Sequence, residues 1–223
     1  DGHDASINIM RRILQQTGAE VIHLGHNRSV GSVADAIVQE DAHSVAISSY
    51  QGGHVEYFKY LKDLLAQRGV PHVRIFGGGG GVIIPEEIRA LQAYGIERIY
   101  SPEDGRRMGL QGIINDLVQR SDYALDADPL DGQIESGEDR VLARAMTLAE
   151  SGKLPATILE TARSTGKKVP VVGLTGTGGA GKSSFCDELV RRFTNDFPQH
   201  RVAVLSVDPT RRRSGGSRSE VYR

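Results

Sequence analysis

The first 121 residues alternate between strand-like and helical patterns, and this alternation restricts the chain to a few folds. Short apolar runs predict strands, and apolar residues at spacings of three and four predict helices. The predicted strands cover residues 20–24, 44–50, 72–76 and 96–100. The predicted helices run from Ile7 to before Gly18 and over residues 30–41, 55–67, 85–94 and 103–119. Strands that alternate with helices predict an α/β fold, in which a doubly wound parallel sheet carries helices on its faces.

The order of these elements bears on the opening segment DGHDAS, residues 1–6. Every predicted strand follows a helix, and the chain starts on a helix. A doubly wound domain should begin with a strand, so we expect its first strand to be missing. DGHDAS would then follow that strand at the carboxyl edge of the sheet, where open α/β sheets bind ligands.

Composition and charge exclude several classes of protein. Of the 223 residues, 39% are hydrophobic and 25% charged, a globular composition with no membrane-spanning run. The net charge of −1 gives no field that would attract nucleic acid or a membrane. The single cysteine, Cys186, excludes a disulfide framework and favours a cytoplasmic protein.

The rest of the chain divides into a connector and a second region. Residues 122–168 start polar and acidic and then show two helical patterns, at 141–150 and 156–162, which predicts a helical linker. Residues 169–175 and 201–208 predict strands on either side of a helix at about 183–193. The predicted organisation is a first domain over 1–121, the linker, and a truncated nucleotide-binding domain over 169–223.

The segment GTGGAGKS, residues 176–183, fits the phosphate-binding pattern G-x-x-x-x-G-K-[ST]. It follows a predicted strand and opens a helix, so its backbone N–H groups can converge on phosphate oxygens. Lys182 would contact the β- and γ-phosphates and Ser183 would coordinate Mg²⁺, with Asp208 reaching the same ion through water. The alternatives are a glycine-rich turn that binds nothing and an ordinary Asp-Pro turn at Asp208. The predicted nucleotide contacts are Gly176, Gly178, Gly179, Ala180, Gly181, Lys182, Ser183 and Ser184.

Three short motifs of the first region resemble a known family. DGHDAS, then Ser48-Ser49-Tyr50, then Gly77-Gly78 resemble the D-x-H-x-x-G…S-x-L…G-G pattern of cobalamin-binding domains. That pattern occurs in methylmalonyl-CoA mutase, glutamate mutase and methionine synthase, and implies a flavodoxin-like fold. Two positions depart from it, because Ser6 replaces a glycine and Tyr50 a leucine.

The resemblance implies roles for these residues. His3 would ligate the cobalt of cobalamin from its lower face, and Asp1 would hydrogen-bond His3 and tune its donor strength. The nucleotide tail of the cofactor would enter a slot beside Ser48, Tyr50, Gly77 and Gly78. A lone histidine in a loop is otherwise ordinary polar surface, and the glycine run is otherwise a loop.

The second region resembles the GTPase chaperones of acyl-CoA mutases, through VVGLTGTGGAGKSS and LSVDPTRRRSGG. A cobalamin domain followed by such a GTPase resembles the fused acyl-CoA mutases. This order implies radical isomerisation of isobutyryl-CoA to n-butyryl-CoA with adenosylcobalamin, gated by GTP hydrolysis with Mg²⁺ and with Lys182 and Asp208 as catalytic residues. The acyl-CoA would bind a barrel absent from this chain, and the whole protein would be a homodimer.

Three alternatives remain at this point. One is a fragment of a methylmalonyl-CoA-type mutase, and another is a non-catalytic cobalamin carrier with a regulatory GTPase. The third is a flavodoxin-like receiver domain coupled to a kinase-type ATPase, which titration with cobalamin would distinguish from the others.

Overall fold

The computed structural model describes residues 4–125, 130, 133–164, 169–206 and 219–220. The chain forms two compact units, Asp1–Leu159 and Glu160–Arg223, which are described separately. The elements of the first unit up to residue 121 are α1 (Asp4–Gln16), α2 (Val30–Gln39), β1 (Ser44–Ser48), α3 (His54–Gln67), β2 (Arg74–Gly78), α4 (Pro85–Tyr94), β3 (Arg98–Tyr100) and α5 (Pro102–Ser121).

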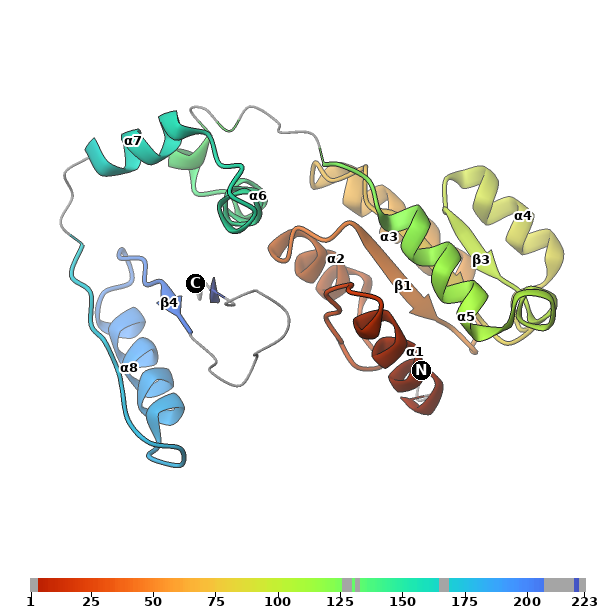
Figure 1. Ribbon diagram of the computed structural model, residues 1–223, viewed down its shortest axis with the longest axis horizontal. Helices are drawn as coiled ribbons and strands as arrows, with labels where there is room; N and C mark the ends of the chain where they lie inside the picture. Colours follow the sequence, from red (N-terminus) through yellow and green to blue (C-terminus); the bar gives the residue numbers. More distant parts are fainter. Residues whose placement is uncertain (1–3, 126–129, 131–132, 165–168, 207–218, 221–223) are drawn as a thin grey trace. The chain divides into compact units, whose positions relative to one another are not determined.

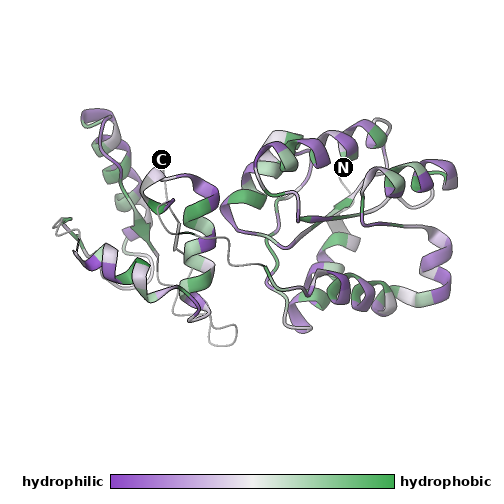
Figure 2. Cartoon of the chain, turned by 90° about the horizontal axis from the view of Figure 1, so that it is seen from above, coloured by the Kyte–Doolittle hydropathy of each residue, from purple (hydrophilic) through white to green (hydrophobic). Residues whose placement is uncertain are grey.

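Three parallel strands form the sheet of the first unit in the order β1-β2-β3 (Figure 1). The predicted α/β architecture is therefore confirmed, and the helices lie within a few residues of their predicted ranges. Figure 2 shows hydrophobic and hydrophilic residues alternating along these helices.

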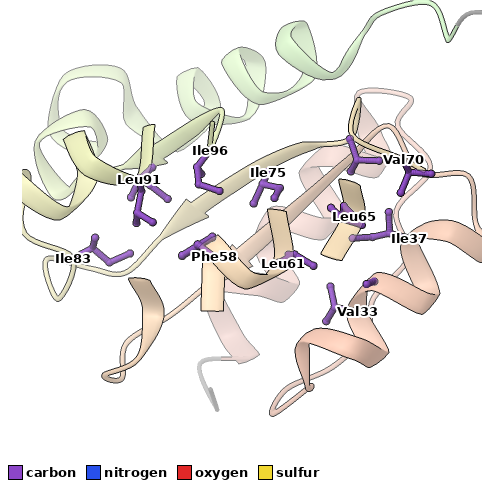
Figure 3. Close-up of a cluster of buried hydrophobic side chains, with 13 residues drawn as sticks. Val33, Ile37, Phe58, Leu61, Leu65, Val70, Ile75, Ile83, Leu91 and Ile96 are labelled. Atoms are coloured by element: carbon purple, nitrogen blue, oxygen red, sulfur yellow. The ribbon is translucent and has the colours of Figure 1, made fainter. Parts of the chain in front are cut away.

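One face of the sheet carries the main hydrophobic core, shown in Figure 3. Phe58, Leu61 and Leu65 of α3 are fully buried there against Ile75 of β2. Helices α2 and α4 extend this core, with Ile37 and Leu91 among its members. Burying each such side chain contributes about 1.5–3 kcal/mol, so this core stabilises the packing of the helices on the sheet.

The other face packs against α5, which in turn contacts α1. Successive residues of a strand point to opposite faces, so Phe76 points away from the Ile75 core. Phe76 stacks on Tyr100 at 6.4 Å, and the Tyr100 hydroxyl donates to Asp116 of α5 over 2.9 Å. Helix α5 is interrupted at Gly109, whose φ of 65° and ψ of 174° are not helical.

Three predicted strands differ from the structure. Residues 20–24 and 169–175 form no strand, and within the described residues 201–206 only Val204–Leu205 form one, β4. A strand needs a neighbour to satisfy its backbone groups, and no described strand lies beside the first two segments. Strand β4 pairs antiparallel with β5 (Ser219–Glu220), which the sequence did not predict.

Part of the predicted helical linker packs on the rest of the first compact unit. The Tyr123 hydroxyl lies 2.7 Å from the carbonyl oxygen of His43 and 2.9 Å from that of His72. After the short 3-10 helix η1 (Ile134–Ser136), helix α6 (Asp139–Glu150) contacts α2. Leu130, Val141 and Leu148 form a second small core. The first compact unit thus extends well past residue 121.

Helix α7 (Ala156–Ser164) spans the boundary between the two units, and α8 (Lys182–Asp196) is the main helix of the second. Val169, Val171 and Val172 of the second unit are largely exposed. Among the helices that the structure describes, none combines the length and apolarity needed to cross a membrane.

Candidate functional site

The carboxyl edge of the sheet brings two of the predicted cofactor residues together. Ser48 ends β1 and Gly78 ends β2, and the two are register partners in the parallel ladder. The Ser49 N–H donates to the Gly78 carbonyl over 2.8 Å, which carries the ladder one residue beyond β1. The Ser48 hydroxyl has no hydrogen-bond partner among the described residues. The Ser48 hydroxyl, with no partner among the described residues, therefore lies beside Gly78, which has no side chain.

Gly77 and Gly78, predicted as a pair, have different surroundings. A Cβ at Gly77 would lie 2.5 Å from Cζ of Phe58 and 2.6 Å from Cδ1 of Ile99, so core side chains already occupy that space. A Cβ at Gly78 would meet nothing closer than the Tyr100 carbonyl oxygen, at 3.7 Å. Packing thus explains the glycine at position 77, whereas Gly78 leaves open space on the α5 face of the sheet.

The next two glycines allow two loops to approach each other closely. We call residues 49–53 the β1 loop and residues 79–84 the β2 loop. A Cβ at Gly79 would lie 2.4 Å from the Ser49 carbonyl oxygen, and one at Gly80 would lie 2.2 Å from Cε1 of Tyr50. Gly80 also has a φ of 55°, which favours glycine. Tyr50, a predicted site residue, therefore lies over Gly80, and the glycine run joins the two loops.

His54, the first residue of α3, is buried between these loops and was not singled out by the sequence. Its Nδ1 lies 3.2 Å from the Gln51 carbonyl oxygen, and its Nε2 lies 3.0 Å from Oε2 of Glu87. The same Glu87 oxygen accepts a hydrogen bond from the Ile84 N–H. A histidine at the start of a helix is common in sequences, so no local pattern marks this arrangement.

The two residues predicted to ligate and support cobalt, Asp1 and His3, lie outside the described residues. Helix α1 begins at Asp4, directly after them. Among the residues that are described, no group of three or more His, Cys, Asp or Glu side chains could hold a metal ion. The metal roles of Asp1 and His3 therefore remain predictions.

The predicted phosphate-binding loop forms in the second unit, directly before α8. Gly181 is the N-cap of this helix with a φ of 79°, and Gly179 has a φ of 77°. The Lys182 ammonium group donates to the carbonyl oxygens of Gly176 and Thr177, both over 2.8 Å. Ser183 and Ser184 are exposed in the first turn of α8. The loop therefore folds around its lysine at a helix N-terminus, where anions bind favourably.

Of the remaining residues predicted for this loop, Gly178 and Ala180 lie within the same turn, whereas Asp208 lies outside the described residues. The Ala180 N–H donates to the Thr177 carbonyl over 3.3 Å. A Cβ at Gly178 would meet nothing within 4 Å, so the loop is open on that side.

Comparisons with known families and proteins agree with the order of these two sites. Residues 1–102 match the B12 binding domain family, and residues 142–218 match the methylmalonyl Co-A mutase-associated GTPase MeaB family. A fused isobutyryl-CoA mutase from Geobacillus kaustophilus is 55% identical over 97% of this chain and 21% of the relative. One from Cupriavidus metallidurans is 58% identical over 97% of this chain and 20% of the relative.

The chain matches one segment of the fused isobutyryl-CoA mutases. The resemblance that the motifs predicted is thus confirmed, in both the cobalamin-binding and the GTPase parts. The chain spans about a fifth of the length of these relatives. A solved cobalamin-binding protein from Desulfitobacterium hafniense covers 55% of this chain and 55% of its own, at 20% identity and a TM-score of 0.44. That similarity is too low to support a conclusion about this chain.

Proposed function

We propose that this chain carries the cobalamin-binding unit of an adenosylcobalamin-dependent acyl-CoA mutase, joined to the phosphate-binding loop of a GTPase. The observation that carries the proposal is the order of the two family matches along one chain, 1–102 and then 142–218. A receiver domain coupled to an ATPase has no support from these matches. Bound cobalamin supplies the radical chemistry of such mutases, and the protein binds and orients it.

The geometry of the first unit fits the nucleotide tail of cobalamin. Such a tail needs a slot that reaches the sheet backbone, and Gly78 leaves that space open. The neighbouring Ser48 hydroxyl has no partner among the described residues and is available to hydrogen-bond the tail. In this proposal His3 ligates the cobalt and Asp1 fixes the tautomer of His3.

The second unit fits a nucleoside triphosphate with Mg²⁺. The loop around Lys182 presents backbone N–H groups at the start of α8, and the exposed Ser183 would coordinate the metal ion. Asp208 is the proposed water-mediated partner of that ion. Hydrolysis of GTP at this site would gate loading of the cofactor. The mutase reaction, which depends on adenosylcobalamin, would convert isobutyryl-CoA to n-butyryl-CoA.

We also propose where the two functional parts meet. The GTPase-family match starts at residue 142, inside α6, yet α6 packs on α2 of the cobalamin-binding unit. The functional boundary would then lie within α6 rather than at residue 121, so that this helix joins the two parts.

Titration with hydroxocobalamin tests the proposed ligand set. The wild-type chain is expected to bind with the visible spectrum of a histidine-ligated corrinoid, and His3→Ala to lose that spectrum and about 10–100-fold in affinity. His26→Ala, in an exposed part of the same unit, is the control. An unchanged spectrum in His3→Ala would mean that another group ligates the cobalt.

A further inference from the structure

His54 links the β1 loop to the β2 loop through two hydrogen bonds on opposite sides of its ring. The residue is 8% exposed, so water does not compete freely for either nitrogen. One nitrogen faces the Gln51 carbonyl of the β1 loop, and the other faces the Glu87 carboxylate of α4. Both neighbours are hydrogen-bond acceptors, so both hydrogen bonds form together only when both ring nitrogens carry protons, that is, in the imidazolium form.

Glu87 completes the link to the β2 loop. The oxygen that bonds His54 also accepts the N–H of Ile84, the last residue of that loop, over 3.0 Å. A continuous path of hydrogen bonds therefore runs from the β1 loop through His54 and Glu87 to the β2 loop. Both loops follow strands at the carboxyl edge, next to the Ser48 and Gly78 pair.

We propose that His54 is a positioning residue, which in its doubly protonated form holds the β1 and β2 loops together and so shapes the surface that receives the cobalamin tail. The inference rests on the proposed cobalamin function. His54 would act through Gln51 and Glu87, the residues that its ring nitrogens face.

The charges around the ring favour this form. Burial alone would lower the pKa of His54, but the Glu87 and Gln51 hydrogen bonds, with the charges of Glu87 on α4 and Glu56 on α3, outweigh it. The pKa of His54 is therefore raised above its ordinary value of 6.5. The hydrogen bond from His54 is the main cause that lowers the pKa of Glu87. The hydrogen-bonded link through His54 and Glu87 is complete at pH values between the pKa of Glu87 and the pKa of His54. It is lost as the pH rises through the pKa of His54.

Hydrogen exchange in the cobalamin-free protein provides the first test. His54→Leu removes both bonds, and His54→Gln retains one amide donor that does not titrate. We expect the Ile84 amide to exchange about ten-fold faster in His54→Leu, because its acceptor Glu87 loses its anchor. Glu86→Gln is the matched control, since Glu86 is exposed on the same turn of α4.

The pH dependence separates positioning from general packing. In the wild type, protection of the Ile84 amide, corrected for intrinsic exchange, should fall as the pH rises through the His54 pKa. In His54→Gln the same protection should not change over that range. Equal exchange in the wild type and both His54 variants would overturn the proposal, and so would the same pH dependence in His54→Gln.

The second test compares cobalamin with cobinamide, a corrinoid that lacks the nucleotide tail. We expect His54→Leu to weaken cobalamin binding about ten-fold, ~1.4 kcal/mol, and to leave cobinamide binding unchanged. Equal loss of affinity for both corrinoids would overturn the positioning role.

If the wild type binds neither corrinoid, the proposed function is wrong, whereas the exchange experiment still reports on the loops. If His54→Leu fails to fold, both tests use His54→Gln instead. We expect His54→Gln to lose less cobalamin affinity than the ten-fold loss expected for His54→Leu.

Discussion

Arg144 of α6 and Asp41, just after α2, form a buried ion pair that joins α6 to the sheet-forming part of the first unit. The Arg144 Nε lies 2.8 Å from Oδ2 of Asp41, and the two side chains are 10% and 5% exposed. Asp41 has a φ of 47°, a conformation that aspartate tolerates better than most residues. This pair helps to hold α6, the helix in which the GTPase-family match begins, against α2 within the first compact unit.

Removal of one partner of this pair should destabilise the first unit. We expect Arg144→Met to lower the free energy of unfolding by about 3 kcal/mol, because it leaves the Asp41 carboxylate buried without its partner. Urea unfolding followed by circular dichroism measures this loss. The double variant Asp41→Asn with Arg144→Met should recover part of it. Arg89→Met is the control, because its pairing with Glu86 is exposed and contributes little; equal losses in the two arginine variants would contradict the prediction.

The two glycines of the predicted pair should respond differently to a methyl group. Gly77→Ala is expected to cost about 1–3 kcal/mol of stability, because its Cβ would overlap Phe58 and Ile99. Gly78→Ala should change stability by no more than about 0.5 kcal/mol, since nothing described lies within 3.4 Å of its Cβ. Thermal unfolding measures both. Gly78→Ala should nevertheless weaken cobalamin binding if the tail lies there, and intact binding would exclude Gly78 from the slot.

Asp104 gives the start of α5 a stability that depends on pH. Burial would raise the pKa of this carboxyl, but hydrogen bonds from Ser101 and the charge and hydrogen bond of Arg98 lower it below 3.8. A lowered pKa contributes stability above the unfolded-state value, and this contribution is lost as the pH falls through the folded-state value. At pH 7, Asp104→Asn should therefore cost about 1–2 kcal/mol.

The acid side of the titration checks this prediction. The difference in unfolding free energy between wild type and Asp104→Asn should shrink as the pH falls through the folded pKa of Asp104. Glu103→Gln, at the neighbouring exposed position, should show no such difference. If the difference in unfolding free energy between wild type and Asp104→Asn stays constant with pH, the loss of stability comes from packing and not from the charge of Asp104.

Lys182 should dominate nucleotide binding by the second unit. In the structure its ammonium group is bonded to two loop carbonyls, and a bound triphosphate offers it stronger, charged acceptors. We expect Lys182→Ala to weaken binding of a fluorescent GTP analogue about 100-fold. Arg191→Ala, whose ion pair with Glu188 is exposed on the same helix, is the control. Equal affinities in both variants would argue against phosphate contact by Lys182.

The local sequence determined most helices and the phosphate-binding turn, because the residue types and apolar spacings that predict them lie within a few neighbouring residues. Helix α4 begins at Pro85 and ends at Tyr94, and its C-cap Gly95 has a φ of 106°. A proline in the first turn and a left-handed glycine after the last turn are both local signals. The glycines and lysine of residues 176–183 likewise form their turn from local conformational preferences. The order of motifs along the chain was also sufficient to indicate the family.

Tertiary structure decided the features that depend on partners distant in sequence. Residues 20–24 and 169–175 have strand composition, yet a strand forms only where a neighbouring strand satisfies its backbone groups. Gly77 differs from Gly78 only because Phe58 and Ile99 fill the space on one face of the sheet. The bond between His54 and Glu87 spans 33 positions, and that between Arg144 and Asp41 spans 103. No local pattern encodes such contacts, because the folding of the whole unit brings their atoms together.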